Sequence, residues 1–164
     1  IKGLDMKVLH TLFKLSMVFT FISLLAGCAL TRETLDLATE ISIEFNVFSI
    51  VNPDSDGRSS PVVLNLLFLK DNRQFEQEDF IALLESPEDR LGKDLIKKIR
   101  LKEFIPSEDR EVSYILPEGV NYVGVVAEFI QYQDAVGKLI LPIEEHASNE
   151  FIVSVDKDTV SIVD

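Results

Sequence analysis

The chain of 164 residues contains no tryptophan, one cysteine and only two histidines. A single cysteine excludes an internal disulfide. His10 lies in an N-terminal apolar region, and His146 follows Glu144 and Glu145 at an expected strand end, where adjacent side chains point to opposite faces. The chain also lacks a glycine-rich phosphate loop and a Gly-x-Ser-x-Gly elbow. The sequence therefore predicts no catalytic site, no metal site and no cofactor.

Basic residues are few: 16 Lys and Arg stand against 28 Asp and Glu, for a formal charge of −12. Removal of residues 1–27, argued below, would leave 13 basic and 27 acidic side chains and a charge of −14. Such acidity argues against nucleic acid or anionic lipid headgroups as partners, because both are polyanions. Two interpretations remain open, namely a solvated acidic exterior and a surface complementary to a basic partner.

The only cysteine closes an apolar run. Leu15–Leu25 is uncharged and follows the basic residues Lys7 and Lys14, and the run ends in Leu25-Ala26-Gly27-Cys28. Two small residues before a cysteine resemble the bacterial lipobox, which directs lipid to the cysteine sulfur and cleavage before it. A transmembrane helix needs about 20 apolar residues, and Lys14 interrupts the run too early for one. We therefore expect a signal peptide over residues 1–27, cleavage between Gly27 and Cys28, and acyl chains such as palmitate on Cys28.

The rest of the chain has the pattern of a β protein. Thr39–Ile50 alternates apolar with polar residues, whereas Val62–Leu69 is apolar throughout and predicts a strand covered on both faces. Asn121–Tyr132 is expected to be the longest strand and the centre of a sheet, and Pro142 predicts an edge strand. The eight expected strands are Thr39–Ile50, Val62–Leu69, Lys97–Phe104, Arg110–Leu116, Asn121–Tyr132, Lys138–Glu145, Glu150–Val155 and Thr159–Val163.

A small helical insertion is expected at about residues 75–92. Phe80, Leu83 and Leu84 have helical spacing, and Ser86-Pro87 predicts a second helix start with Ser as N-cap and Pro at the first position. Gly92 is expected to end it. The predicted fold is an antiparallel β-sandwich of about eight strands over residues 39–164, preceded by a tether over residues 28–38.

The segment Asn52–Pro61 predicts a long exposed loop. Proline cannot donate to a strand ladder, glycine supplies positive φ, and Asn and Asp side chains cap local turns. Asp54-Ser55-Asp56-Gly57 faintly resembles the start of a calcium loop. It lacks the third acidic position before the glycine and the terminal Glu, so turn capping explains the two aspartates better.

Several stretches in order resemble one family, the outer-membrane lipoproteins of type VI secretion systems known as TssJ or SciN. The sequence after the long strand departs from the family pattern, because the chain has no tryptophan there. The resemblance covers Cys28 to about Tyr132 and rests on the lipobox, Asn52-Pro53-Asp54, Gly57, Pro61, Phe75, Asp79-Phe80, Leu83, Leu91-Gly92-Lys93-Asp94-Leu95, Pro106 and Tyr122-Val123-Gly124-Val125-Val126-Ala127.

This resemblance implies a transthyretin-like β-sandwich on the periplasmic face of the outer membrane, bound to the periplasmic C-terminal region of TssM. Ala29 after the cysteine, rather than Asp, favours outer-membrane sorting. The family resemblance also implies that the loop after the first strand contacts the partner. In this loop Asn52, Pro53, Asp54, Gly57 and Pro61 match the family, Ser55, Asp56, Arg58, Ser59 and Ser60 are enclosed by them, and Arg58 is the candidate for direct contact.

Two other functions remain open at this point. The chain could be a lipoprotein of another system, either pilotin-like or a ligand-binding transthyretin-like module. A lipoprotein hydrolase is supported by fold analogy alone, and the missing set of histidine, carboxylate and nucleophile argues against it.

Overall fold

The structure is a computed structural model that describes residues 37–163. The expected signal peptide, Gly27, Cys28 and most of the tether lie outside the described residues. In the described part, the elements are β1 (Glu40–Val51), β2 (Leu64–Leu69), α2 (Arg73–Gln77), α3 (Phe80–Glu85), α4 (Pro87–Leu91), the 3-10 turn η1 (Gly92–Asp94), β3 (Leu95–Arg100), β4 (Asp109–Ile115), β5 (Tyr122–Ala127), β6 (Lys138–Pro142), β7 (Ser148–Lys157) and β8 (Thr159–Ile162).

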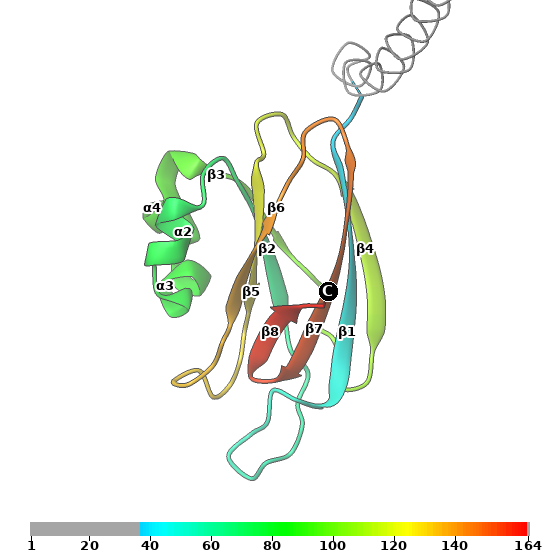
Figure 1. The fold of residues 1–164 in the computed structure, drawn as a ribbon. Coiled ribbons are helices and arrows are strands. Elements are labelled where there is room, and N and C mark those ends of the chain that lie inside the picture. Colours follow the sequence, from blue (N-terminus) through cyan, green and yellow to red (C-terminus); the bar gives the residue numbers. More distant parts are fainter. Residues whose placement is uncertain (1–36, 164) are drawn as a thin grey trace, which may run out of the picture. The chain divides into compact units, whose positions relative to one another are not determined.

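The strands form two facing sheets, with the orders β4-β1-β7-β8 and β3-β2-β5-β6 (Figure 1). Alternation directs Ile41, Ile43, Phe45 and Val47 of β1 into the core between the sheets. All six residues of β2 are buried, because its other face lies under the helices. The described residues thus confirm an eight-stranded β-sandwich with a small helical insertion.

One strand pair departs from the predicted antiparallel arrangement. β1 pairs with β4 antiparallel on one side, but with β7 parallel on the other, from Glu40 beside Ser148 to Val47 beside Val155. Alternation of apolar residues specifies which face of a strand is buried, but not the direction of its neighbour. The sequence pattern therefore could not reveal this parallel pair.

Two strands are shorter than predicted. β5 lies inside its sheet as expected, but it ends at Ala127, and β1 is the longest strand with 12 residues. The expected strand Lys97–Phe104 ends at Arg100, and Val62 joins Phe104 only through an isolated bridge. Leu101 and Phe104 are both buried, and a spacing of three cannot place two residues on one face of a continuous strand.

The predictions for the last strands are confirmed. β6 is an edge strand and Pro142 is its last residue. β7 and β8 form a hairpin, with β7 extending to Lys157, whose φ of 51° closes the turn.

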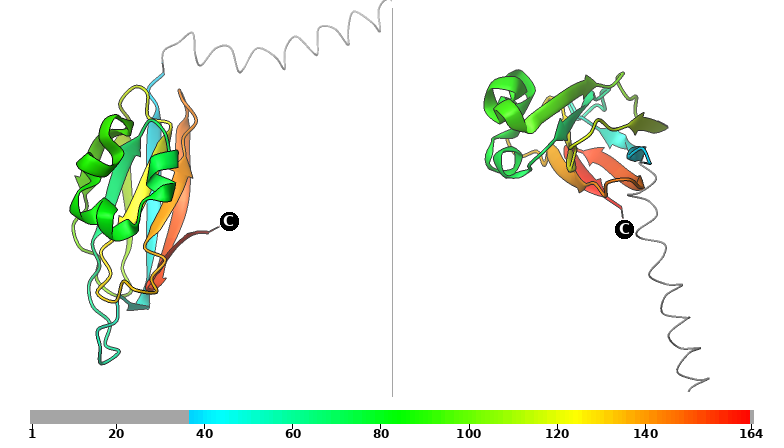
Figure 2. Two further views of the ribbon diagram at one scale, coloured as in Figure 1. Left: turned by 90° about the vertical axis from the view of Figure 1, so that its left-hand side faces the viewer. Right: turned by 90° about the horizontal axis from the view of Figure 1, so that it is seen from above.

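The helices cover the outer face of the β3-β2-β5-β6 sheet (Figures 1 and 2). Phe75 of α2 is 1% exposed and its ring lies against Gly124 of β5, so closely that a Cβ there would stand 2.5 Å from Cε2. Lys138 of β6 fastens the end of α2: its Nζ donates to the carbonyl oxygens of Phe75 at 2.9 Å, Glu76 at 3.0 Å and Glu78. The ammonium thereby pairs carbonyl groups that the short helix leaves without partners.

The helix boundaries agree with the sequence in most respects. Pro87 occupies the first position of α4, and Gly92 ends it with φ 51°. Ser86 stands at the N-cap but makes no capping hydrogen bond, whereas Asp79 Oδ1 accepts from Ile81 N at 2.9 Å and caps α3.

The contact between Phe75 and Gly124 generates a stability prediction. Gly124→Ala should lower the free energy of unfolding by about 1–3 kcal/mol, because the methyl group overlaps a buried ring. Urea denaturation measures the change. Phe75→Leu in the same protein should recover part of the loss, and a Gly124→Ala protein as stable as the parent would contradict this packing.

Candidate functional site

The β1–β2 loop, Asn52–Pro61, lies at the end of the sandwich where β1 finishes (Figure 1, bottom). The 12 residues of β1 place this loop about 36 Å from Glu40, at roughly 3.3 Å per residue. The β5–β6 loop (residues 128–137) and the β7–β8 turn lie at the same end. The loop is therefore held at the opposite end of the domain from the start of β1.

Asp54 organises the tip of the loop. Its Oδ1 accepts hydrogen bonds from the backbone N–H groups of Asp56 and Arg58, both at 2.9 Å. The backbone adds two further bonds, from Gly57 N to Asp54 O at 3.0 Å and from Asp54 N to Arg58 O at 2.9 Å. Gly57 has φ 77° with open space around it, so it serves the turn and not a close contact. The interpretation of Asp54 as a turn-capping residue is confirmed.

Arg58 is exposed but already paired. Its Nε and Nη2 both lie 2.9 Å from Asp54 Oδ2, and Nη2 lies 3.0 Å from Asp56 Oδ2. The side chain of Arg58 is 74% exposed. A partner carboxylate would have to compete with these two aspartates, which argues against Arg58 as a free binding group.

Asn52 connects the loop to its neighbours. It is 3% exposed and has φ 45°, a left-handed conformation that Asn tolerates better than most residues. Its Nδ2 donates to Pro61 O at 2.6 Å and its Oδ1 accepts from Ile130 N at 2.7 Å. Its backbone N donates to Lys157 O at 2.6 Å. The side chain of Asn52 thus joins the two ends of its loop and connects them to the β5–β6 loop, and its backbone N–H connects them to the β7–β8 turn.

The β5–β6 loop is a part of the site that the sequence analysis missed. Gln131 Nε2 donates to Asp54 O at 2.7 Å and to Pro53 O at 3.2 Å. Ile130 and Tyr132 beside it are 53% and 48% exposed. The sequence analysis placed these three residues at the end of the expected strand Asn121–Tyr132. That placement gave no reason to expect them in a loop that contacts Asn52–Pro61.

Exposed apolar residues also flank the loop on β1. Phe48 and Ile50 are each 53% exposed, and they lie where the register of β1 against β7 shifts between Val47 and Val51. Both stand at outward-facing positions of β1, in the same alternation as Ser42, Glu44 and Asn46. The loop therefore projects from a rim that carries apolar groups on two sides.

These geometries describe one rigid surface at the loop end of the sandwich. Among residues 37–163, no group of three or more His, Cys, Asp or Glu side chains could hold a metal ion. No helix in this range is long and apolar enough to cross a membrane. The described residues form a β-sandwich whose loops are tied together at one end.

The comparisons identify the family. Residues 39–158 match the family model T6SS-SciN, described as "Type VI secretion lipoprotein, VasD, EvfM, TssJ, VC_A0113". The chain belongs to this family of type VI secretion lipoproteins, as its motifs indicated. The family is a secretion lipoprotein family and not an enzyme family. No curated protein matches the chain.

Solved structures confirm the fold. The T6SS lipoprotein TssJ1 from Pseudomonas aeruginosa is 24% identical, with a TM-score of 0.72, over 77% of this chain and 95% of that one. Serratia marcescens Lip, a membrane bound component of the type VI secretion system, is 18% identical, with a TM-score of 0.71, over 77% of this chain and 98% of that one. A chain of the structure described as "T6SS protein TssM C-terminal domain (869-1107) from EAEC" is 20% identical, with a TM-score of 0.64, over 77% and 98%.

The bonds of Asn52 predict a large effect of its removal. Asn52→Ala should cost about 1–3 kcal/mol of unfolding free energy, because it strands a carbonyl and a backbone N–H and places a less tolerant residue at positive φ. Thermal and urea unfolding measure this loss. Ser55→Ala, at an exposed position of the same loop, should change the stability by no more than about 0.5 kcal/mol. Equal stability of the two variants would refute the role of Asn52.

The carboxylate of Asp54 predicts a pH dependence of the loop. The backbone N–H of Arg58, the Arg58 side chain and the N–H of Asp56 hold the pKa of Asp54 below its ordinary value of 3.8. Because the pKa is lowered in the folded state, the stabilisation is full above pH 3.8 and is lost as the pH falls through the folded value. NMR should show lower protection factors, relative to the intrinsic exchange rate at each pH, for the Asp56 and Arg58 amide protons in that acidic range. Asp54→Ala, which removes the acceptor, should lower the protection already at neutral pH, and unchanged protection in this variant would contradict the prediction.

Proposed function

We propose that this protein is a non-enzymatic adaptor of a type VI secretion membrane complex. Lipid on Cys28 would hold it in the outer membrane, and the β-sandwich would face the periplasm and bind the periplasmic C-terminal region of TssM through the β1–β2 loop. Membership of the lipoprotein family supports the secretion role. The likeness to a chain of a type VI membrane complex structure agrees with it, at 20% identity and a TM-score of 0.68, over 77% of this chain and 99% of that one.

The observation that carries this proposal is the placement of the loop relative to the start of β1. Cys28 precedes Glu40 by only 12 residues, and the loop lies about 36 Å further on, at the far end of β1. A domain attached through Cys28 can therefore present the loop away from its anchor. Three acyl chains would make that anchor essentially permanent, because each buried methylene contributes about 0.8 kcal/mol.

The rigidity of the loop supports its use as a contact surface. The bonds of Asp54 and Asn52 set its conformation before any partner arrives, so little conformational entropy is left to lose on association. The same bonds also allow a design that removes the loop alone. The flanking strands β1 and β2 have their own ladders to β7, β4, β3 and β5.

The proposal predicts binding between two purified domains. Residues 28–164 with Cys28→Ser should bind the periplasmic C-terminal region of TssM from the same organism in isothermal titration. A protein in which a short Gly/Ser turn replaces residues 54–59, with Asn52 and Pro61 kept, should fold and lose binding. Binding by both proteins would move the contact elsewhere on the sandwich, and binding by neither would refute the adaptor role.

In cells, Cys28→Ser should abolish secretion while leaving the domain folded, because the anchor and the partner surface would be uncoupled. Fractionation and an effector secretion assay measure this. An outer-membrane Cys28→Ser protein that supports normal secretion would contradict the lipid anchor.

A further inference from the structure

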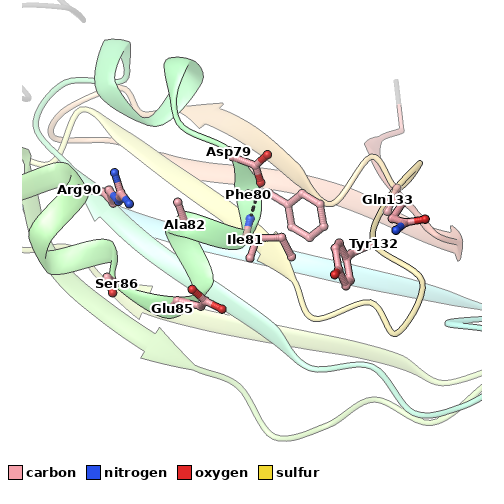
Figure 3. A pocket seen from close by; sticks show the side chains of 10 residues that line it. Asp79, Phe80, Ile81, Ala82, Glu85, Ser86, Arg90, Tyr132 and Gln133 are labelled. Carbon is pink, nitrogen blue, oxygen red and sulfur yellow. Dashed lines mark hydrogen bonds between the residues drawn. The ribbon is translucent and has the colours of Figure 1, made fainter.

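A groove lies between α3 and the β5–β6 loop (Figure 3). It has a volume of about 660 Å³. We call it the α3 groove and define it by Phe80, Ile81, Glu85, Arg90, Tyr132 and Ala135. Figure 3 shows the rings of Phe80 and Tyr132 and the side chain of Ile81 gathered at one end, and Glu85 and Arg90 at the other.

The α3 wall of the groove is fixed to the rest of the domain. The ring of Phe80 lies on Gly137, where an added Cβ would stand 2.9 Å from Cδ2. Asp79 caps α3 through Ile81 N, and Lys138 fastens the end of the preceding helix. This wall is therefore in place before a ligand binds.

The groove is continuous with the proposed partner site. Gln131, which donates to the carbonyl oxygens of Pro53 and Asp54, directly precedes Tyr132, which lines the groove. Ile130 on the other side of Gln131 is 53% exposed and donates its N–H to Asn52. A partner that covers the β1–β2 loop would meet Ile130 and then Tyr132 without a gap.

The lining chemistry specifies the occupant. Phe80, Ile81, Ala135 and the Tyr132 ring form an apolar floor, and tyrosine is a frequent anchor at interfaces because it combines a large apolar ring with a polar end. Asp79 and Glu85 make the rim acidic, while Arg90 lies 3.9 Å from Glu78. The groove therefore fits an apolar side chain with basic neighbours.

We propose that the α3 groove is a second contact site for the same partner, and that it takes an apolar side chain flanked by Lys or Arg from the periplasmic region of TssM. This inference rests on the proposed function. It assigns the partner a footprint across two loops and a helix, with Tyr132 and Ile81 as the residues that contribute most to binding in the groove.

Isothermal titration of residues 28–164 carrying Cys28→Ser against the TssM periplasmic region tests the inference. Residues 38–164 form one compact unit, so this domain suits the experiment. Tyr132→Ala and Ile81→Gln should each weaken binding roughly tenfold or more. Glu85→Gln should weaken it a few-fold and reduce its dependence on salt. Ile115→Ser, at a 70% exposed apolar residue of β4, is the matched control and should stay within about twofold.

The outcomes separate this inference from the adaptor role. No binding by the parent protein would refute the proposed function itself. If the parent protein binds and both Tyr132→Ala and Ile81→Gln bind within twofold of it, the groove is not a contact site. The proposed adaptor role would then stand without it. If Tyr132→Ala lowers the melting temperature, its loss of binding could reflect unfolding, and the binding of Ile81→Gln alone then tests the groove. Sedimentation that shows a parental dimer, dissociated by either groove variant, would assign the groove to a second copy of the chain and overturn the inference.

Discussion

The functional end of this domain depends on one buried asparagine. Asn52 follows the last residue of β1, adopts a left-handed backbone conformation, and exchanges hydrogen bonds with Pro61, Ile130 and Lys157. A hydrophobic residue there would leave two backbone groups, the Pro61 carbonyl and the Ile130 N–H, without their side-chain partners, and a larger polar one would not reach the same positions. Through this residue the β1–β2 loop, the β5–β6 loop and the β7–β8 turn become one rigid surface and not three independent loops.

The second constraint is the attachment of the helices to one sheet. Glycine at position 124 lets the ring of Phe75 sit on the backbone of β5, and glycine at 137 does the same for Phe80. Lys138 then donates to carbonyl oxygens that a five-residue helix cannot pair by itself. Burial lowers the pKa of Lys138, whereas Asp79, Glu76 and Glu78 favour its charged form. Two glycines, two phenylalanine rings and one lysine therefore position the helices on the sheet. Helices this short are not stable through intrinsic helix propensity alone.

Features set by local sequence patterns were predicted correctly, whereas features set by contacts between residues far apart in the chain were not. Alternation in β1 and the unbroken apolar run of β2 depend on which face is buried, and both predictions are confirmed. Beyond the end of β5, Asn52 Oδ1 accepts a hydrogen bond from Ile130 N, a contact between residues 78 apart in the chain that no local pattern predicts. The loop itself was recognisable from its Pro, Gly and Asp residues, but its partner Gln131 was not, because no local pattern marks a glutamine that bonds a distant backbone. The pairing of Arg58 within its own loop was likewise not predictable from a local pattern, and its contact with a partner stays a prediction.

The outer faces of the two sheets and the exposed groups at the loop end both concern the proposed function. On the outer face of the β4-β1-β7-β8 sheet, Glu44 lies directly opposite Glu111, an arrangement that costs stability unless water screens it. Ser42 donates to Glu111 there. The opposite sheet is covered by its helices. At the loop end, exposed Phe48, Ile50, Ile130 and Tyr132 surround a backbone that Asn52 and Asp54 fix. In the proposed adaptor, contact groups at that end would face away from the start of β1, where the chain leads back to Cys28.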